Sequence, residues 1–335
     1  MQLLQEGEIM IQFGLKALLV GMCTCLLSLS AHAQSDYPTK PITYVVPYPP
    51  GGAADVFARQ LAKKLSERLG KPVVIENRPG ANGNIGSEYV AKAPADGYMI
   101  LLGSASTITI NPHLYGKQMP YDPMKDLQPV SGTHEMANVL VVNVATPYKN
   151  VADVIAAAKA KPGVIAYASA GNGNTMHLAG EQFKMQADID LLHVPYKGGP
   201  PALNDVLGGQ VPMMFNNLPA IVMLVNSGKL RALGVGSAKR SSLLPGVPTM
   251  DEAGMKGYVS IVWNGIFVRA GTPRPIVERL NREIVAILNE PDTKRSLEEQ
   301  GFNTMPTSPE QFADLIRADY PRWGTLVKAS GAKVD

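Results

Sequence analysis

Cysteine is scarce in this sequence of 335 residues: the only two, Cys23 and Cys25, lie inside an apolar run near the N-terminus. Their position in that run indicates apolar filler rather than a chemical role. If cleavage after Ala33 removes the run, the remaining chain has no thiol, no disulfide and no metal site built on cysteine. That composition suits an exported, single-chain protein.

The sequence also lacks a large excess of charge of either sign. The 31 lysines and arginines nearly balance the 28 aspartates and glutamates, which gives a formal net charge of +3. The basic residues are dispersed, whereas nucleic-acid binding needs a basic cluster. A nucleic-acid partner is therefore excluded. The slight positive balance is compatible with an anionic ligand but does not argue for one.

Motifs for catalysis and for metal binding are also missing. The sequence has no G-x-S-x-G motif, and His134-Glu135 has no second histidine to complete H-E-x-x-H. The other histidines beyond residue 33, which are His113, His177 and His193, are too scattered to indicate a metal site. We therefore expect no enzyme, no metal and no cofactor. A secreted hydrolase, the enzymatic alternative, would lack a nucleophile and its base.

The N-terminus has the parts of a secretory signal peptide: Lys16, the apolar run 17–30 and an A-x-A sequence that ends at Ala33. The run is too short for a membrane helix, which needs about 20 residues. We expect cleavage after Ala33. Residues 1–9 are acidic where a signal peptide is basic, so translation from Met10 is an alternative start.

From residue 42 onward, strand and helix patterns alternate. Apolar strands at 42–46, 73–77 and 98–104 are separated by helices. In the first helix, apolar residues recur at every fourth position over 57–69. This βαβαβ order predicts a parallel sheet with helices on its faces. The long extended section 126–147, in which 139–144 is almost purely apolar, is either a strand buried on both faces or a crossing between domains. The alternation then begins again.

Two α/β halves joined by crossing strands favour a hinged clamshell over a single sheet. We assign residues 34–135 and 255–335 to one domain and residues 136–254 to the other. The end of the chain reads as helical, and Ser308 begins a capping-box sequence for the last helix. Ligands of open α/β sheets bind at the carboxyl ends of the strands, which is where the loops described next would lie.

The first of these loops follows the strand at 42–46. Gly51 and Gly52 let backbone amides approach an anion, and the N-terminus of the next helix adds partial positive charge. The lysine and hydroxyl residue of a nucleotide P-loop are missing after these glycines, and Asp55 in the first helical turn would repel a phosphate. The loop therefore suits a carboxylate, although a plain strand-to-helix turn is the alternative.

The second loop, at 169–180, has Gly171 and Gly173 in G-x-G spacing. Met176 stands where a dinucleotide fingerprint has its third glycine, so we do not expect NAD. What remains is a loop of free amides to which Asn172 and its neighbours add further donors.

Several single residues have two possible roles. His177 is either a buried histidine or a ligand contact, and Asn216 either faces the ligand or forms a simple turn. The aromatic rings of Tyr48 and Tyr196 could stack on a ligand, whereas core packing is favoured for Phe215 and for Trp263.

Five blocks of sequence, at 37–55, 73–104, 194–211, 244–254 and 263–273, together resemble the Bug-type solute-binding receptors of tripartite tricarboxylate transporters. The blocks occur in the family's order and span the chain beyond the signal segment. The resemblance implies an α/β periplasmic binding protein of the two-domain, hinged type II class. It implies small carboxylate ligands, namely di- and tricarboxylic acids, acidic amino acids, nicotinate and aromatic acids.

The resemblance also implies a site, a location and partners. It maps the ligand loops onto 48–55 and 169–175, and Ala53-Ala54 departs from the Pro, Ser or Thr that relatives often carry. We expect a periplasmic monomer that delivers its ligand to membrane permease subunits; the alternative is a receptor that presents it to a sensor kinase. The candidate ligand-binding residues are Tyr48, Gly51, Gly52, Ala53, Ala54, Asp55, Ser104, Ser106, Ser169, Ala170, Gly171, Asn172, Thr175, His177, Tyr196, Phe215 and Asn216.

Overall fold

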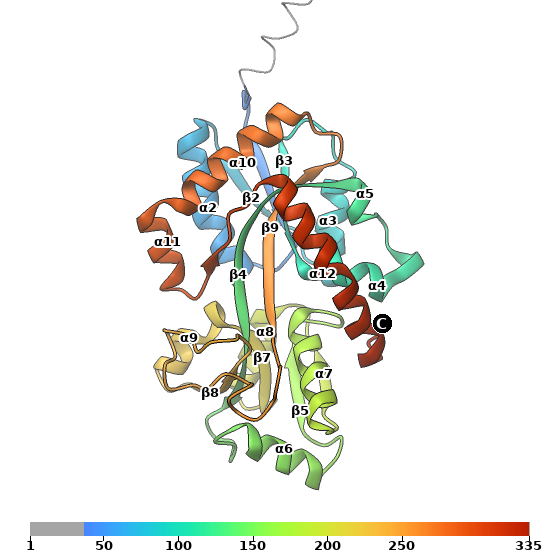
Figure 1. Ribbon diagram of the computed structural model, residues 1–335, viewed down its shortest axis with the longest axis vertical. Helices are drawn as coiled ribbons and strands as arrows, with labels where there is room; N and C mark the ends of the chain where they lie inside the picture. Colours follow the sequence, from blue (N-terminus) through green and yellow to red (C-terminus); the bar gives the residue numbers. More distant parts are fainter. Residues whose placement is uncertain (1–36, 335) are drawn as a thin grey trace, which may run out of the picture. The chain divides into compact units, whose positions relative to one another are not determined.

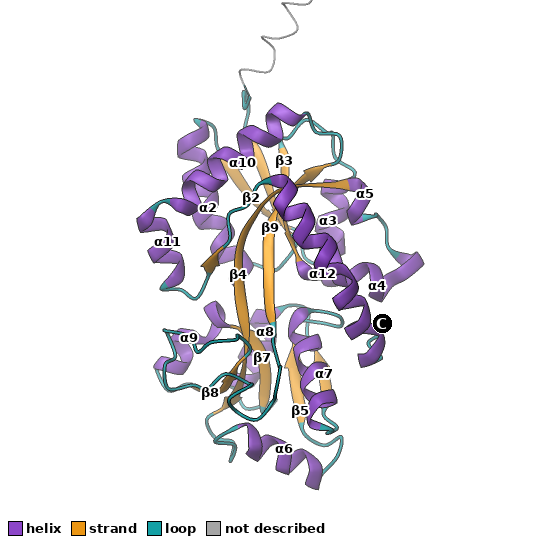
Figure 2. Ribbon diagram, in the orientation of Figure 1, coloured by secondary structure: helices purple, strands orange, loops and turns teal. Residues whose placement is uncertain are grey.

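The computed structural model describes residues 37–334, so the expected signal peptide and its cleavage site lie outside the described chain. From Lys40 onward the described chain forms one compact unit. It is a mixed α/β structure in which helices flank two groups of strands (Figures 1 and 2).

The strands are β1 (Ile42–Val46), β2 (Val73–Asn77), β3 (Met99–Ser104), β4 (Leu127–Asn143), β5 (Ala166–Ser169), β6 (Leu192–Pro195), β7 (Met213–Asn217), β8 (Leu230–Val235), β9 (Ile261–Arg269) and β10 (Asn303–Thr304). The α-helices are α2 (Ala53–Leu69), α3 (Asn84–Ala91), α4 (Asn111–Tyr115), α5 (Pro123–Asp126), α6 (Val151–Ala160), α7 (Thr175–Ala187), α8 (Gly199–Leu207), α9 (Leu218–Asn226), α10 (Arg274–Asn289), α11 (Pro291–Glu298) and α12 (Pro309–Ser330). Short helical turns are η1 (Ala81–Gly83), η2 (Ser106–Ile110) and η3 (Gly116–Gln118).

The first sheet region consists of β2, β1, β3, β9 and the first part of β4, in that order. Strand β1 is parallel to both β2 and β3, as the βαβαβ pattern predicts. Helix α2 buries Phe57, Leu61 and Leu65, and it ends at Gly70, whose φ of 66° is the left-handed conformation that favours glycine. The predicted apolar face of this helix is therefore confirmed.

The second sheet region consists of the last part of β4 with β7, β5, β6 and β8. Strand β5 is parallel to β6 and β7, whereas β7 and β8 are antiparallel to β4. Its core includes Phe183, Phe215 and Tyr258, all nearly inaccessible to solvent. The repeat of the strand–helix alternation after residue 147 is thus confirmed.

Strands β4 and β9 run between the two sheet regions (Figure 2). β4 pairs with β9 over Leu127–Ala137 and then with β7 from Asn138 onward. Strand β4 is largely buried and runs from one sheet region to the other, so the two interpretations of 126–147 are compatible with each other. The change of partner lies beside the predicted domain boundary at 135/136, and the division into two domains stays a prediction.

The C-terminal helices follow their sequence signals. Ser308 Oγ accepts from the Gln311 amide at 3.1 Å, and Gln311 Oε1 accepts from the Ser308 amide at 3.0 Å, which is the predicted capping box of α12. No helix in residues 37–334 is long and apolar enough to cross a membrane.

Candidate functional site

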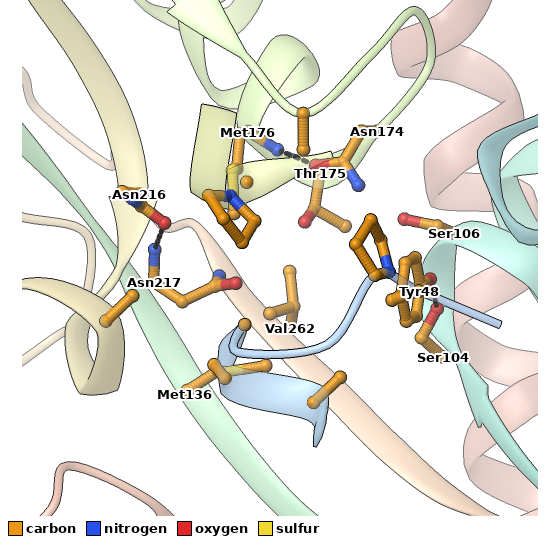
Figure 3. A pocket seen from close by; sticks show the side chains of 18 of the residues that line it. Tyr48, Ser104, Ser106, Met136, Asn174, Thr175, Met176, Asn216, Asn217 and Val262 are labelled. Carbon is orange, nitrogen blue, oxygen red and sulfur yellow. Dashed lines mark hydrogen bonds between the residues drawn. The ribbon is translucent and has the colours of Figure 1, made fainter. Parts of the chain in front are cut away.

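A cavity of about 290 Å³ lies between the two sheet regions. The crossing strands β4 and β9 contribute Met136 and Val262 to its wall (Figure 3), and helices α2, α7, α8 and α9 each contribute residues of their first turn. The lining residues are Tyr48, Pro49, Gly51, Gly52, Ala53, Ala54, Ser104, Ser106, Met136, Ala170, Asn174, Thr175, Met176, Gly199, Pro200, Leu203, Asn204, Asn216, Asn217, Ala220, Val262, Trp263 and Asn264.

The cavity brings together many of the residues predicted from sequence, and it draws them from both loops. Their contact with a ligand stays a prediction. The predicted residues that line the cavity are Tyr48, Gly51, Gly52, Ala53, Ala54, Ser104, Ser106, Ala170, Thr175 and Asn216.

The N-terminus of α2 forms one end of the cavity. Gly51 has a φ of 83°, a conformation that costs glycine little. Gly52 is the N-cap residue and has no side chain to accept from the first-turn amides. Ala53 and Ala54 add no polar side chain either. The partial positive charge at this helix end is therefore available to an anion.

Asp55 lies in the first turn of α2, but its side chain faces the protein. It is buried, and its carboxylate accepts from the Gly51 amide at 3.0 Å, from Arg59 Nε at 2.9 Å and from Asn77 Nδ2 at 2.9 Å. Burial alone would raise the pKa of Asp55, but these hydrogen bonds, led by the one from Arg59, hold it below its ordinary value. Asp55 therefore fixes the loop and does not line the cavity.

Tyr48 and Ser104 form a polar pair at the same end of the cavity. The Tyr48 hydroxyl lies 2.6 Å from Ser104 Oγ, and Figure 3 shows the two side chains together. Burial raises the pKa of Tyr48, against the opposing effect of hydrogen bonds from Ser104 and Ser106. The hydroxyl is therefore a neutral group that can donate to a ligand oxygen.

The second loop leads into α7 at the opposite side of the cavity. Asn174 is the N-cap residue, and its Oδ1 accepts from the Met176 amide at 2.9 Å. Gly171 and Gly173 have φ values of 129° and 70°, which explains the glycines of the G-x-G spacing as turn residues. Thr175 and Met176 then line the cavity.

His177 lies behind this loop and outside the cavity lining. Its Nδ1 accepts from the Gly173 amide at 3.0 Å, and its ring stacks on His193 with centroids 3.8 Å apart. Burial lowers the pKa of His177 to about 4, although nearby Glu181 opposes this. The ring is therefore neutral near pH 7, and the geometry matches the buried-histidine alternative.

The other predicted residues outside the lining are held by the protein itself. Phe215 is fully buried against Phe183 and Tyr258, which agrees with the core-packing role favoured from the sequence. The hydroxyl of Tyr196 donates to Asp205 at 2.6 Å. The remaining residues outside the lining, all in the second loop, are Ser169, Gly171 and Asn172.

Several lining residues were not predicted, because the sequence signals used to locate the site were those of two loops only. Helix α8 contributes Gly199 and Pro200, and β9 contributes Val262 and Asn264. The Gly-Gly-Pro-Pro sequence at 198–201, which forms the N-cap and first residues of α8, resembles the small-residue helix start of the first loop, and this signal could have located α8. Nothing comparable marks β9, whose Asn264 breaks its apolar pattern.

The cavity wall carries no charged side chain: none of its lining residues is a lysine, arginine, histidine, aspartate or glutamate. In residues 37–334, moreover, no group of three potential metal ligands is found. The wall consists of hydroxyl groups, amide groups and helix N-termini, together with apolar side chains. Such a wall can bind a small anion through hydrogen bonds and partial charges.

Comparison with known proteins gives consistent matches over nearly the whole chain. The family model described as tripartite tricarboxylate transporter family receptor matches residues 57–332. Protein BugT of Bordetella pertussis is 37% identical over 316 residues, which cover 94% of this chain and 97% of BugT. The structure of Rpa4515 from R. palustris with adipate is 37% identical, has a TM-score of 0.86, and is matched over 89% of this chain and 99% of that one. MatC from Rhodopseudomonas palustris with bound malate is 30% identical, has a TM-score of 0.82, and is matched over 87% of this chain and 100% of that one.

The fold is thus that of a periplasmic binding protein, a class whose members bind solutes. Within that class the chain belongs to the tripartite tricarboxylate transporter receptor family, which includes the Bug proteins. The resemblance found in the sequence is confirmed. The family and its structural neighbours are substrate-binding receptors and not enzymes.

Proposed function

We propose that this receptor captures a small organic carboxylate in the cavity and delivers it to the membrane permease subunits of a tripartite transporter. The ligand class is a di- or tricarboxylate, or an aromatic acid. The predicted residues that line the cavity would contact it, with one carboxylate held at the end formed by Tyr48 and Gly52–Ala54.

The observation that carries this proposal is the uncapped N-terminus of α2 beside a wall without charged side chains. Backbone amides and a helix dipole favour an anion of low charge. A phosphate group, which can carry two charges where a carboxylate group carries one, is commonly held by lysine or arginine side chains, which this wall does not offer. The apolar side chains, among them Met136 and Leu203, suit the carbon skeleton of an organic acid.

The relatives support the same ligand class. One structural neighbour holds adipate and another holds malate, and both compounds are dicarboxylates with a short carbon chain. A two-domain receptor that closes around such a ligand would divide at 34–135 and 255–335 against 136–254. We further propose that the protein is a monomer exported to the periplasm after cleavage behind Ala33.

A thermal-shift screen of the protein against organic acids tests this function. A ligand present at about 100 times its dissociation constant stabilises the folded state by about 2.7 kcal/mol. We expect di- or tricarboxylates or aromatic acids to raise the unfolding midpoint, and sugars and cationic amino acids to leave it unchanged. If only the latter compounds shifted the midpoint, the carboxylate proposal would fail.

Delivery and export need separate measurements. Uptake of the identified acid should require both this receptor and the permease subunits, and uptake that persists without the receptor would argue against delivery. Mass spectrometry of the exported protein should give an N-terminus at Gln34.

A further inference from the structure

One polar side chain of the cavity wall has no hydrogen-bond partner. Asn264 on β9 is only 2% exposed and lines the cavity, and its Nδ2 atom is buried without a partner in residues 37–334. A buried amide that has given up its hydrogen bonds to water is unfavourable until a new partner replaces them. A hydrogen-bond partner for Asn264 Nδ2 must therefore come from a molecule other than residues 37–334 of this chain.

Neighbouring asparagines are used differently. Asn138 Nδ2 donates to Ser260 Oγ at 2.9 Å, and Asn217 Nδ2 donates to Asn138 Oδ1 at 2.9 Å. Those amides hold β4, β7 and the segment before β9 together, so their role is structural. Asn264 Nδ2 makes no such bond within residues 37–334. The backbone of Asn264 takes part in the strand pairing, and its carbonyl oxygen also accepts from Thr133 Oγ1 at 3.1 Å.

The position of Asn264 places it beside the expected carboxylate. In the pairing of β3 with β9, Asn264 lies opposite Ser104, and Ser104 Oγ lies 2.6 Å from the Tyr48 hydroxyl. The wall residues that continue along β4 and β9, Met136 and Val262, are apolar. Asn264 is therefore the polar residue that these two strands add next to the α2 end of the cavity.

We propose that Asn264 is a specificity-determining residue that hydrogen-bonds to an oxygen substituent on the carbon chain of the ligand, close to the carboxylate at the α2 end. This inference rests on the proposed function. A carboxamide offers one donor side and one acceptor side, which matches a hydroxyl group because a hydroxyl both donates and accepts. A site that pairs a buried polar group with a ligand oxygen discriminates strongly against a ligand without that oxygen.

Calorimetric titration with pairs of acids that differ by one hydroxyl tests the proposal. Malate and succinate form the first pair, and 2-hydroxyadipate and adipate form the second. For at least one pair, the wild-type protein should bind the hydroxy acid about tenfold or more tightly than its unsubstituted partner. In Asn264→Leu this ratio should fall to about one, because the hydroxy acid loses its partner while the unsubstituted acid keeps its contacts.

Two further variants keep the result interpretable. Asn264→Ala removes the same amide with a smaller side chain, and it should lose the preference even if the leucine does not fit. Asn289→Leu makes the same exchange at an exposed position at the end of α10, outside the cavity lining, so its ratio should stay near the wild-type value.

The outcomes separate this inference from the function on which it rests. Equal binding within both pairs, or a preference that survives in Asn264→Leu and Asn264→Ala, would overturn the role of Asn264 and leave the carboxylate receptor intact. Failure of every organic acid in the screen would overturn both.

Discussion

The two loops that meet at the cavity are built alike but are capped differently. Each follows a strand, contains at least one glycine at positive φ and leads into a helix whose first turn lines the cavity. At α2 the N-cap residue is Gly52, which has no side chain, whereas at α7 it is Asn174, whose side chain already accepts from the Met176 amide. The N-cap residue of α2 thus engages no first-turn amide, although the Gly51 amide of the first loop donates to Asp55. The second loop uses three of its amides internally, those of Gly171, Gly173 and Met176.

The two other helices at the cavity extend this contrast. Helix α8 begins Gly199-Pro200-Pro201, and α9 has Pro219 as its second residue. Proline has no amide hydrogen to donate, so these helix ends offer fewer donors than α2. We therefore expect the α2 end to hold one carboxylate with the larger number of amide donors, and the second sheet region to offer fewer charge-binding donors together with shape and neutral hydrogen bonds.

The largest effect is expected from Gly52→Val. A Cβ at Gly52 would meet Pro200 Cδ and the Pro49 carbonyl oxygen at 3.9 Å, which is ordinary contact. Because Gly52 lines the cavity, we expect the two further methyl groups of valine to occupy space that a ligand needs. The φ of Gly52 is −80°, which valine adopts, so the fold should survive. Carboxylate affinity should fall by about 100-fold or more, as measured by calorimetry.

Gly52→Ala is the matched control, because its single methyl group makes only the ordinary contacts. It should bind within about threefold of the wild type. Native affinity in Gly52→Val would show that the first loop does not hold the carboxylate.

The next effect concerns the ligand and tests whether both ends of the cavity recognise charge. A diacid should bind more tightly than its own monoamide, because a charge-assisted hydrogen bond contributes about 1.5–3 kcal/mol. That difference corresponds to roughly 10- to 100-fold in the dissociation constant, measured by calorimetry on both compounds. Equal affinities would confine charge recognition to the α2 end, and a monocarboxylate would become the better ligand candidate.

Much of the fold could be predicted because its elements have local signals. The apolar spacing over 57–69 and the capping box at Ser308 depend on neighbouring residues alone, and both agree with the structure. Strand β9 was missed, since Asn264 and Gly265 interrupt its apolar pattern, and its pairing with β4 joins residues far apart in the sequence.

The candidate site was predicted in part for the same reason. Glycines before a helix mark a loop that can hold an anion, and this signal located Gly51 and Gly52. Side-chain direction is not encoded locally, so Asp55, His177 and Phe215 were included although each faces the protein. A position in or beside such a loop predicts that a residue lies near the cavity, but it does not predict the direction of the side chain.

Asp55→Asn should destabilise the first loop and show a characteristic pH dependence. At pH 7 the charge-assisted bond from Arg59 is lost, and we expect unfolding in urea to give a loss of about 1–3 kcal/mol. Because the pKa of Asp55 in the folded protein lies below its ordinary value of 3.8, the carboxylate stabilises the fold fully above 3.8. This contribution disappears as the pH falls through the folded-state pKa.

The difference in stability between wild type and Asp55→Asn should therefore be constant from about pH 7 to 5 and shrink below 3.8. A difference that stays unchanged in acid would mean that the carboxylate charge does not hold the loop.

The smallest effect on affinity is expected from Asn174→Ala, which removes the side chain that distinguishes the second loop. Loss of an N-cap residue costs about 1 kcal/mol of stability, so the unfolding midpoint in urea should fall. The Met176 amide, however, becomes available to a ligand, and this gain offsets the looser start of α7. Affinity for the best diacid should thus stay within about threefold of the wild type, against the loss of about 100-fold or more in Gly52→Val. A loss of similar size in Asn174→Ala would contradict the contrast between the loops, because the second loop would then hold charge as strongly as the first.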